Sequence, residues 1–509
     1  MSPTYRELIL RGARGHGDRV AISAGALDLT FAEVDALSTR LANALAAYGI
    51  APRARLALLL NNGPLSIPVD FACVKANLNR VPLNARLSLD EHARMLVETA
   101  AEALLYGADL AERALALAER VPGLRAIPLE PGPHDRDALS VRAESASPEL
   151  APLAVDPSDV ILTLYTSGTT GTLKAAQHTQ ASYAAICRNV LLNLVPVRED
   201  DAMLQAASLI HASGVFVLPF WLRGARTVIM PAFEPKEFLR LLDAEAITAI
   251  NLVPTMLQML LQQPDVDARD YRTLRTIIYG ASPIPQPVLA RAMAVFGRER
   301  FFQYYGQTEA PLCITVLRPE DHAGERLRSC GKPSIDVEVK LVDPAGAEVP
   351  AGREGEIAVR APSMMAGYFA APELDAEMRL PDGWLRTRDV GVFDRDGFLY
   401  LLDRTSDMIV TGGYNVYPRE VEDVLLTHPA VRECAVIGLP DETWVEAVVA
   451  VVVAEPGTVG EDELIAFCRD RLAGYKKPQR VIFDAVIPKT AVGKVSRKTL
   501  RDRHRNGAV

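Results

Sequence analysis

The sequence predicts an α/β fold in more than one domain, and three observations support this prediction. At 509 residues the chain exceeds what one ordinary hydrophobic core holds together. Short apolar runs alternate with helix-length segments over roughly the first 330 residues, as in mainly parallel sheets covered by helices. Apolar residues make up 49% of the chain and charged residues 23%, a balance typical of a globular protein rather than a disordered one.

The first well-marked element is a helix that follows Thr30. Thr30 and Glu33 have the spacing of a capping box, and Gly49 is a suitable stop. The apolar residues between them recur at helical spacing and define one buried face: Val34, Leu37, Leu41, Leu45 and Tyr48.

Strands are expected where short runs of apolar residues lie between such helices. Five runs fit this description: Arg55–Leu60, Ala103–Gly107, Thr227–Met230, Ala249–Val253 and Thr276–Gly280. Most are separated by helix-length segments, so the layered α/β arrangement extends through this region.

The pattern changes after about Gly331. Apolar and polar residues alternate there between turn residues, which indicates an antiparallel, β-rich subdomain. The last hundred residues have the alternation of a small α+β domain. We therefore expect a large domain over residues 1–403, a hinge at 404–406 and a small mobile C-terminal domain over residues 407–509.

Composition and patterning exclude several classes of protein. The net charge of −9, from 64 acidic and 55 basic residues, argues against nucleic-acid binding. No two of the six cysteines lie closer than 17 positions, so zinc-site spacing is absent and a reducing cytoplasm fits best. The start of the chain lacks the apolar core of a signal peptide, and the run Ala447–Ala454 is too short to span a membrane. We expect a cytoplasmic monomer or homodimer.

The stretch LYTSGTTGTLKAAQH, residues 164–178, surrounds one lysine with hydroxyl and glycine residues. A Ser/Thr/Gly-rich stretch of this kind is either a flexible linker or a phosphate cradle, in which backbone N–H groups, hydroxyls and Lys174 face a polyphosphate. The Walker A pattern G-x-x-x-x-G-K-[ST] does not occur in the chain.

A second group of candidate residues follows two expected strands, in YGASPIP (residues 279–285) and FFQYYGQTEAP (residues 301–311). Open α/β sheets bind ligands where strands end in small residues. Glu309 can hold a divalent cation, Thr308 can donate to a phosphate and Tyr305 can stack on a base. The alternative is a structural role, with buried aromatic rings and a helix-capping threonine.

Two further segments are open to plain structural interpretations when each is considered by itself. Residues 382–422 are rich in charge and can form a solvated hairpin. The C-terminal segment PKTAVGKVSRKTLRD carries Lys494 among basic residues and can be a solvated helix.

Considered together, the four segments resemble the motifs of the adenylate-forming superfamily in order and spacing. This superfamily contains acyl- and aryl-CoA ligases, nonribosomal adenylation domains, beetle luciferase and amide-forming ligases. The resemblance extends from about Thr30 to Leu500, and is strongest to the acyl-CoA ligases.

The resemblance implies a role for each matching residue. The ATP phosphates would be held by Thr166, Ser167, Gly168, Thr169, Thr170, Gly171 and Lys174. Adenine would lie against Gly280, Ala281, Ser282 and Tyr305, and ribose against Asp389 with Arg404 nearby. Thr308 would contact the α-phosphate, Glu309 would bind Mg²⁺ and Lys494 would reach in from the small domain. The acid would lie against His211, Gly214, Val215 and Gly306, and the acceptor against Gly412, Gly413 and Tyr414.

Two positions depart from the common pattern of the family. The phosphate loop has Leu173 and Ala175 in place of the usual proline and glycine, which alters loop stiffness without removing a donor side chain. The hinge position has Ser406, where aspartate or lysine is common.

The implied activity is ATP-dependent activation of a carboxylic acid as acyl-AMP, with Mg²⁺ and with CoA as acceptor. Transfer to an amine or amino acid is an alternative, and a nucleotide-binding protein without catalysis is a third. The apolar residues around His211 favour a hydrophobic monocarboxylic acid, although a histidine in such surroundings can also be a packed core residue.

Overall fold

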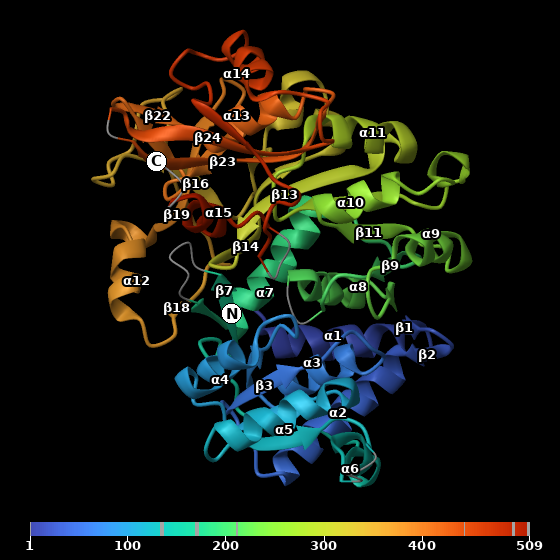
Figure 1. The fold of residues 1–509 in the computed structure, drawn as a ribbon. Helices are drawn as coiled ribbons and strands as arrows, with labels where there is room; N and C mark the ends of the chain where they lie inside the picture. The colour runs from blue at the N-terminus through green and yellow to red at the C-terminus, as the bar shows by residue number, and fades with distance from the viewer. Residues whose placement is uncertain are drawn as a thin grey trace.

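The structure is a computed structural model that describes residues 2–132, 137–167, 173–209, 212–441, 443–490 and 494–505. Its strands form four sheets, three of them upstream of Arg404 and the fourth in a C-terminal domain. Figure 1 shows the C-terminal sheet at one end of the molecule and the helices of the first 150 residues at the other. The predicted α/β class with several layered units is confirmed.

The largest sheet has nine strands and a parallel centre. Antiparallel strands are added at both edges. Its order is β15 (Lys332–Pro333), β14 (Ala310–Leu317), β13 (Phe301–Gln307), β12 (Thr276–Gly280), β11 (Ala249–Leu252), β9 (Ala202–Gln205), β10 (Arg226–Ile229), β1 (Val20–Ala24) and β2 (Leu27–Thr30).

The second sheet has seven strands, parallel except at the edge formed by β8 and β18. Its order is β18 (Gly367–Tyr368), β8 (Leu173–Thr179), β7 (Val160–Ser167), β4 (Asn79–Pro82), β3 (Arg55–Leu59), β5 (Ala103–Tyr106) and β6 (Arg125–Pro128).

Two smaller sheets follow in the chain. The predicted β-rich region is a four-stranded antiparallel sheet of β16 (Glu338–Val342), β17 (Gly355–Arg360), β19 (Leu385–Phe393) and β20 (Leu399–Arg404). The C-terminal sheet contains β22 (Tyr414–Val416), β21 (Ile409–Thr411), β24 (Val445–Ala454), β23 (Val431–Asp441) and β25 (Arg480–Phe483). Helices α13 (Pro418–Leu425), α14 (Glu461–Arg469) and α15 (Arg497–His504) complete the α+β domain.

The remaining α-helices lie upstream of the four-stranded sheet, except for α12, which lies within its sequence. They are α1 (Tyr5–His16), α2 (Phe31–Ala47), α3 (Ser66–Lys75), α4 (Leu89–Glu98), α5 (Ala111–Arg120), α6 (Leu139–Ser145), α7 (Gln180–Asn189), α8 (Val217–Leu222), α9 (Pro235–Ala244), α10 (Pro254–Leu261), α11 (Gln286–Phe296) and α12 (Pro372–Met378).

Helix α2 begins with the predicted capping box. The Thr30 hydroxyl accepts from the Glu33 backbone N–H at 3.2 Å, and the Glu33 carboxylate accepts from the Thr30 N–H at 2.7 Å. The helix also buries Ser38 and Thr39, which the apolar pattern does not explain. Both bind the fully buried ammonium of Lys75, which also donates to the Asp35 carboxylate at 2.6 Å. The buried ammonium of Lys75 and the hydroxyls of Ser38 and Thr39 are therefore all hydrogen-bonded, as burial requires.

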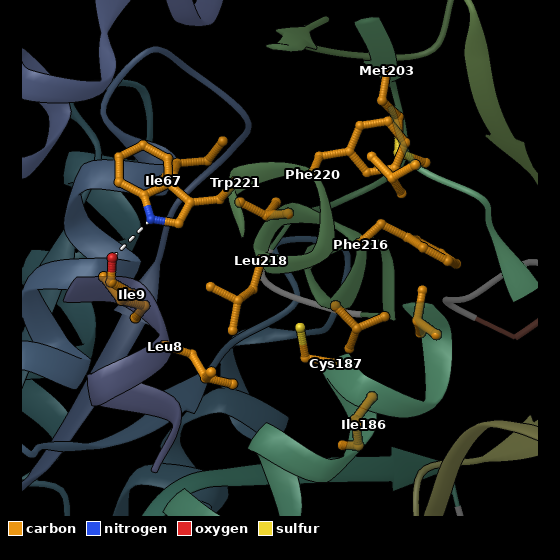
Figure 2. Close-up of a cluster of buried hydrophobic side chains, with 14 of the residues drawn as sticks. Leu8, Ile9, Ile67, Ile186, Cys187, Met203, Phe216, Leu218, Phe220 and Trp221 are labelled. Atoms are coloured by element: carbon orange, nitrogen blue, oxygen red, sulfur yellow. Dashed lines mark hydrogen bonds between the residues drawn. The ribbon is translucent and has the colours of Figure 1, made fainter. Parts of the chain in front are cut away.

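The main core lies where α1, α2, α3, α7 and α8 meet. Helix α8 is apolar on almost every side, and Leu218, Phe220 and Trp221 are all buried. Figure 2 shows the Trp221 indole N–H donating to the Ile9 carbonyl at 2.8 Å across this core. Because α8 follows the expected acid-binding segment directly, this packing fixes the end of that segment against the rest of the domain.

None of the helices that the structure describes is long and apolar enough to cross a membrane.

Candidate active site

The predicted phosphate loop connects β7 and β8, which pair in antiparallel fashion with Thr166 opposite Lys174. Both of these residues are partly buried. Gly168, Thr169, Thr170 and Gly171 lie outside the described residues, and only the backbone of Ser167 is described. Because the strands pair up to Ser167 and Leu173, the stretch connects two strands of one sheet and is not an interdomain linker.

The predicted adenine site lies at the end of β12. A side chain at Gly280 would place its Cβ 2.5 Å from the Tyr304 carbonyl oxygen, so only glycine fits between β12 and β13. Ala281 follows with φ +66°, a left-handed conformation that is costly for alanine. Ala281 and Ser282 are partly buried, at the carboxyl end of the parallel strands where open sheets bind ligands.

The Thr308–Glu309 turn between β13 and β14 is held from two directions. The His178 imidazole Nε2 lies 2.8 Å from the Thr308 carbonyl oxygen, and the Met365 N–H donates to the Glu309 carbonyl at 2.8 Å. Burial lowers the pKa of His178 to about 4, so the ring is neutral near neutral pH and donates to this carbonyl from Nε2. Gly306 is required nearby, since its Cβ would lie 2.6 Å from the Leu312 nitrogen.

Glu309 is oriented by a residue that the sequence analysis did not identify. The Tyr368 hydroxyl donates to Glu309 Oε1 at 2.6 Å, and the Lys174 ammonium lies 5.9 Å from the centre of the Tyr368 ring. Tyr368 is placed by strand β18, which pairs with β8 beside Lys174. Tyr368 therefore connects the candidate metal ligand to the candidate phosphate lysine.

Asp389 lies on β19, paired with Arg404 on β20. Its carboxylate accepts from the Tyr305 hydroxyl at 2.6 Å and lies 3.5 Å from the Arg404 guanidinium. Burial raises the pKa of Asp389, while Arg404, the Tyr305 hydrogen bond and Lys494 act in the opposite direction. Tyr305 itself is 7% exposed. The candidate ribose ligand and the candidate adenine-stacking ring are thus in direct contact.

Lys494 is brought to these carboxylates by the C-terminal domain. Burial and the nearby Arg404 guanidinium lower the pKa of Lys494, whereas the charges of Asp389 and Glu309 raise it. The Lys494 backbone is held by the Thr490 N–H, which donates to the Lys494 carbonyl at 2.7 Å. The charge of a lysine from the C-terminal domain therefore interacts with the charges of two carboxylates that lie upstream of that domain.

The acid-binding segment is only partly described. His211 lies outside the described residues; Gly214 and Val215 lie in the 3₁₀-helix Ala212–Phe216 that precedes α8. Val215 is buried, and a Cβ on Gly214 would collide with the Leu209 carbonyl oxygen, so only glycine fits at position 214.

Gly412 and Gly413 form an exposed hairpin turn between β21 and β22, and the exposed Tyr414 is the first residue of β22. Both glycines have positive φ, +55° and +81°, as a two-residue turn of this kind requires. The Tyr414 ring stacks on Tyr475 with ring centres 4.5 Å apart. Trp444 packs against Gly412 and is 49% exposed, so three aromatic rings lie on the surface of this turn.

The donor set fits MgATP rather than a dedicated metal centre. No group of three His, Cys, Asp or Glu side chains within the described residues can hold a metal ion. Mg²⁺ in nucleotide sites is bound by one or two carboxylates, with phosphates and water supplying the other ligands, and Glu309 provides such a carboxylate. With Lys174, Lys494 and the candidate ribose ligand Asp389 in the same site, the fold and the site define an ATP-dependent ligase that forms an adenylate.

Comparison with known proteins establishes the family. Residues 9–369 match the family described as AMP-binding enzyme, and residues 420–494 match the AMP-binding enzyme C-terminal domain. The chain belongs to the AMP-binding enzyme family, and the resemblance inferred from the four sequence motifs is confirmed.

The relatives include ligases for aromatic and for aliphatic acids. A feruloyl-CoA synthase of Amycolatopsis is 38% identical over 97% of this chain and 98% of its own length. The medium/long-chain-fatty-acid–CoA ligase FadD8 of Mycobacterium tuberculosis is 37% identical over 100% of this chain and 91% of its own length.

Solved structures of similar fold extend over almost the whole chain. ATP-bound MatB of Rhodopseudomonas palustris superposes with a TM-score of 0.91 at 29% identity, covering 99% of this chain and 100% of MatB. The amide bond synthetase McbA of Marinactinospora thermotolerans has a TM-score of 0.89 at 31% identity, covering 98% of this chain and 99% of McbA.

Proposed function

We propose that the protein activates a hydrophobic carboxylic acid as acyl-AMP, releases pyrophosphate and then transfers the acyl group to the thiol of CoA. The observation that carries the proposal is the convergence of Lys494 with Asp389 and Glu309, since it joins the two domains in one charged site. A nucleotide-binding protein without catalysis does not need a partly buried lysine whose charge interacts with carboxylates of another domain.

In the first half-reaction, a carboxylate oxygen of the acid attacks the α-phosphorus of ATP. The new oxygen–phosphorus bond forms as the bond to pyrophosphate breaks, and negative charge develops on the phosphoryl oxygens. Lys494 stabilises this charge at the α-phosphate, Thr308 donates to it and Lys174 holds the departing pyrophosphate. Mg²⁺ bound at Glu309 adds positive charge beside the phosphates.

Binding of the nucleotide uses the remaining predicted residues. Asp389 accepts from the ribose hydroxyls, with Arg404 beside it, and adenine lies between Tyr305 and the Gly280–Ser282 segment. The hydroxyl and glycine residues 166–171 surround the β- and γ-phosphates. Both Asp389 oxygens retain acceptor capacity, because Tyr305 and Arg404 each use only part of it.

In the second half-reaction, the CoA sulfur attacks the acyl carbonyl and AMP leaves. We infer that the C-terminal domain, residues 407–509, turns about the hinge 404–406 relative to the large domain, residues 1–403. In this arrangement the charge of Lys494 interacts with the site, while Gly412 and Gly413 are exposed to solvent. A rotation would move Lys494 away from the site and bring Gly412 and Gly413 to it. The exposed rings of Tyr414, Trp444 and Tyr475 suit the adenine of CoA, because bases stack on aromatic side chains.

The acid is proposed to lie against Gly214, Val215 and Gly306, with His211 beside its carboxylate. Val215 and its neighbour Val217 are buried and apolar, which favours an aryl or alkyl group. The feruloyl-CoA synthase and the fatty-acid ligase among the relatives support both kinds of chain.

The direct test is the product pattern with ATP, Mg²⁺ and a panel of aryl and alkyl acids. We expect AMP and pyrophosphate in equal amounts, with acyl-CoA when CoA is present. Formation of ADP and phosphate would refute adenylation. Absence of ATP–pyrophosphate exchange with every acid would favour a nucleotide-binding protein without catalysis.

A second candidate is an amide synthetase that uses an amine or amino acid as acceptor. Similarity to McbA and the altered loop residues Leu173 and Ala175 favour it. Acyl-AMP formed in place is offered CoA or amines, and the products are resolved by mass. If thioester forms faster than amide, the result supports CoA as the acceptor. If amide forms readily and CoA does not react, the result supports an amide synthetase, and the adenylation step is unchanged.

Gly413 offers a variant that separates the two acceptors. Because its φ of +81° strains most side chains, the substitution is Gly413→Asn, since asparagine tolerates this conformation. The added side chain should obstruct a pantetheine arm and reduce thioester formation at least about tenfold, with pyrophosphate release unchanged. Asn415→Gln in the same exposed hairpin serves as the control. Equal thioester rates in the Gly413 variant and the wild type would contradict the placement of CoA.

A further inference from the structure

An irregular stretch of β19 lies immediately before the candidate ribose ligand Asp389. The register of β19 against β17 shifts there, so that residues 387–389 of β19 lie opposite a single residue of β17. Arg388, at the centre of this bulge, has a φ of +61°. Bulges are frequent next to active sites, where they redirect a side chain. The bulge therefore gives the Arg388 side chain a direction that a regular strand would not give it.

The left-handed conformation of Arg388 is fixed by hydrogen bonds on both sides of the residue. Its N–H donates to the Glu356 carboxylate at 3.0 Å, and its carbonyl accepts from the Thr405 N–H at 2.9 Å. Glycine adopts this conformation without cost, whereas an arginine is disfavoured in it. Disfavoured conformations that surrounding contacts maintain are concentrated at catalytic and ligand-binding sites. The side chain at position 388 is therefore a candidate for a functional contact.

The contacts that the Arg388 side chain makes within the protein are weak. Its guanidinium lies 2.5 Å from the Glu377 carboxylate of α12, and its Nε lies 3.1 Å from the Met378 sulfur. The Arg388 side chain is 37% exposed and that of Glu377 is 61% exposed. Among the residues that the structure describes, no other carboxylate lies within ion-pair distance of Arg388. An exposed ion pair contributes little to stability, so this pair does not offset the disfavoured backbone conformation.

Arg388 lies near the residue that connects the candidate metal ligand to the candidate phosphate lysine. Helix α12 packs against both β18 and β19, and its Asp375 carboxylate accepts from the Tyr368 N–H at 2.9 Å (Figure 1). Burial raises the pKa of Tyr368, and the nearby Arg388 guanidinium acts in the opposite direction. The Tyr368 hydroxyl donates to Glu309, and its ring lies beside Lys174. The guanidinium is therefore on the side of the site where the terminal phosphates of ATP are proposed to bind.

We propose that Arg388 is a phosphate-binding residue, which leaves Glu377 to bind the β- and γ-phosphates of ATP and the pyrophosphate formed from them. The inference rests on the ATP site of the proposed function and adds a cation to that site. A guanidinium binds phosphate oxygens through parallel N–H donors, and a polyphosphate competes well with one exposed carboxylate. Because AMP lacks the terminal phosphates, its binding does not depend on Arg388.

The test measures binding without turnover. The probes are α,β-methylene-ATP with Mg²⁺, pyrophosphate with Mg²⁺, and AMP, and each Kd is measured by calorimetry. Arg388→Asn removes the guanidinium and introduces a residue that tolerates positive φ. It should raise the Kd of α,β-methylene-ATP and of pyrophosphate at least about tenfold, the usual effect of one hydrogen bond between charged groups, and leave the Kd of AMP unchanged. Arg388→Lys keeps the charge, and its affinities should lie between those of Arg388→Asn and the wild type.

Two further variants separate phosphate binding from a structural role. Glu377→Gln removes the carboxylate that competes with phosphate for Arg388, so the affinity for α,β-methylene-ATP should stay the same or increase. Arg360→Asn is the matched control, because Arg360 forms an ion pair of similar exposure, 40% and 61%, with Glu338 in the same sheet. It should change none of the three affinities. Denaturant midpoints verify that each variant is folded.

The outcomes separate this inference from the proposed function. Equal affinities for α,β-methylene-ATP in Arg388→Asn and the wild type would overturn the inference while adenylation stands. An equal loss of AMP affinity would overturn it as well, because the effect would then come from displacement of Asp389. Weakened binding in Glu377→Gln to the same extent as in Arg388→Asn would mean that the arginine acts only through α12.

Failure of the proposed function gives a different result. If the wild type bound α,β-methylene-ATP but released no pyrophosphate with any acid, adenylation would be refuted, and the binding comparison would still decide the role of Arg388. If the wild type bound no α,β-methylene-ATP, both the proposed function and the inference would be refuted.

Discussion

Replacing Tyr368 by phenylalanine tests how the candidate metal ligand is held. The change removes the hydroxyl that donates to Glu309 at 2.6 Å and keeps the ring that lies beside Lys174. A hydrogen bond to a charged acceptor contributes about 1.5–3 kcal/mol, which corresponds to a factor of about 10–150. Loss of a group that orients a metal ligand costs about 10–100-fold in metal affinity. We therefore expect the Mg²⁺ concentration at half-saturation to rise at least about tenfold.

Two measurements follow the change in metal affinity. One is the Mg²⁺ dependence of ATP–pyrophosphate exchange; the other is Mn²⁺ binding in the presence of a non-hydrolysable ATP analogue, which does not depend on turnover. Tyr165→Phe is the matched control, because the Tyr165 hydroxyl donates to the Glu98 carboxylate at 3.0 Å, outside the candidate site. An unchanged metal titration in Tyr368→Phe, with the fold intact, would refute the assignment of Tyr368 as a positioning residue for Glu309.

Two further substitutions test the proposed catalytic lysine, Lys494, and the buried lysine, Lys75. Lys494→Ala should slow adenylation by about 10²–10³, the scale of one preorganised charge donor, and leave acyl transfer from supplied acyl-AMP nearly intact; equal losses in both half-reactions would contradict the assignment. Lys75→Met should lower the stability of the large domain by about 2–4 kcal/mol, since Ser38, Thr39 and Asp35 lose their shared partner. Denaturant unfolding checks this, with the exposed Lys236→Met as control; matching midpoints would refute the structural role.

Local signals in the sequence were enough to predict many of the helices and strands and part of the candidate site. The Thr30–Glu33 capping box and the strand that ends at Gly280 depend on neighbouring residues, and the structure has both as predicted. The convergence of Lys494 with Asp389 and Glu309 was implied only by family resemblance, because these residues lie on separate elements. The roles assigned to individual site residues stay predictions until tested.

Other parts of the site depend on contacts that no local pattern records. Tyr368 is 59 residues from Glu309 in sequence, and His178 is 130 residues from Thr308. Each lies at or beside a strand whose sheet position is set by pairing with distant strands, so its partner cannot be read from spacing. The same reasoning applies to Arg80, which looks like an ordinary charged residue of a strand until its burial and its ion pair with Asp70 are known.

The contacts that hold the two domains in this arrangement lead to a final prediction. Tyr417 of the C-terminal domain donates to the Glu354 carboxylate at 2.9 Å, and Arg328 lies 3.4 Å from the Asp423 carboxylate. Both contacts join the C-terminal domain to the large domain and are away from the Lys494 cluster. We expect the proposed rotation of the C-terminal domain to break both contacts, so that they stabilise the adenylating arrangement relative to a rotated one.

Removing both contacts with Tyr417→Phe and Arg328→Gln should shift the population toward other orientations. A hydrogen bond to the exposed Glu354 carboxylate and a partly exposed ion pair, both weakened by solvent, together contribute about 1–2 kcal/mol, so adenylation should slow by up to about 30-fold. Acyl transfer from supplied acyl-AMP should be unchanged or faster. The control Arg503→Gln removes a contact to Asp484 within the C-terminal domain and should change neither step. If the double variant slowed both half-reactions alike, the two contacts would contribute only to the stability of the fold. They would then not favour the adenylating arrangement over a rotated one.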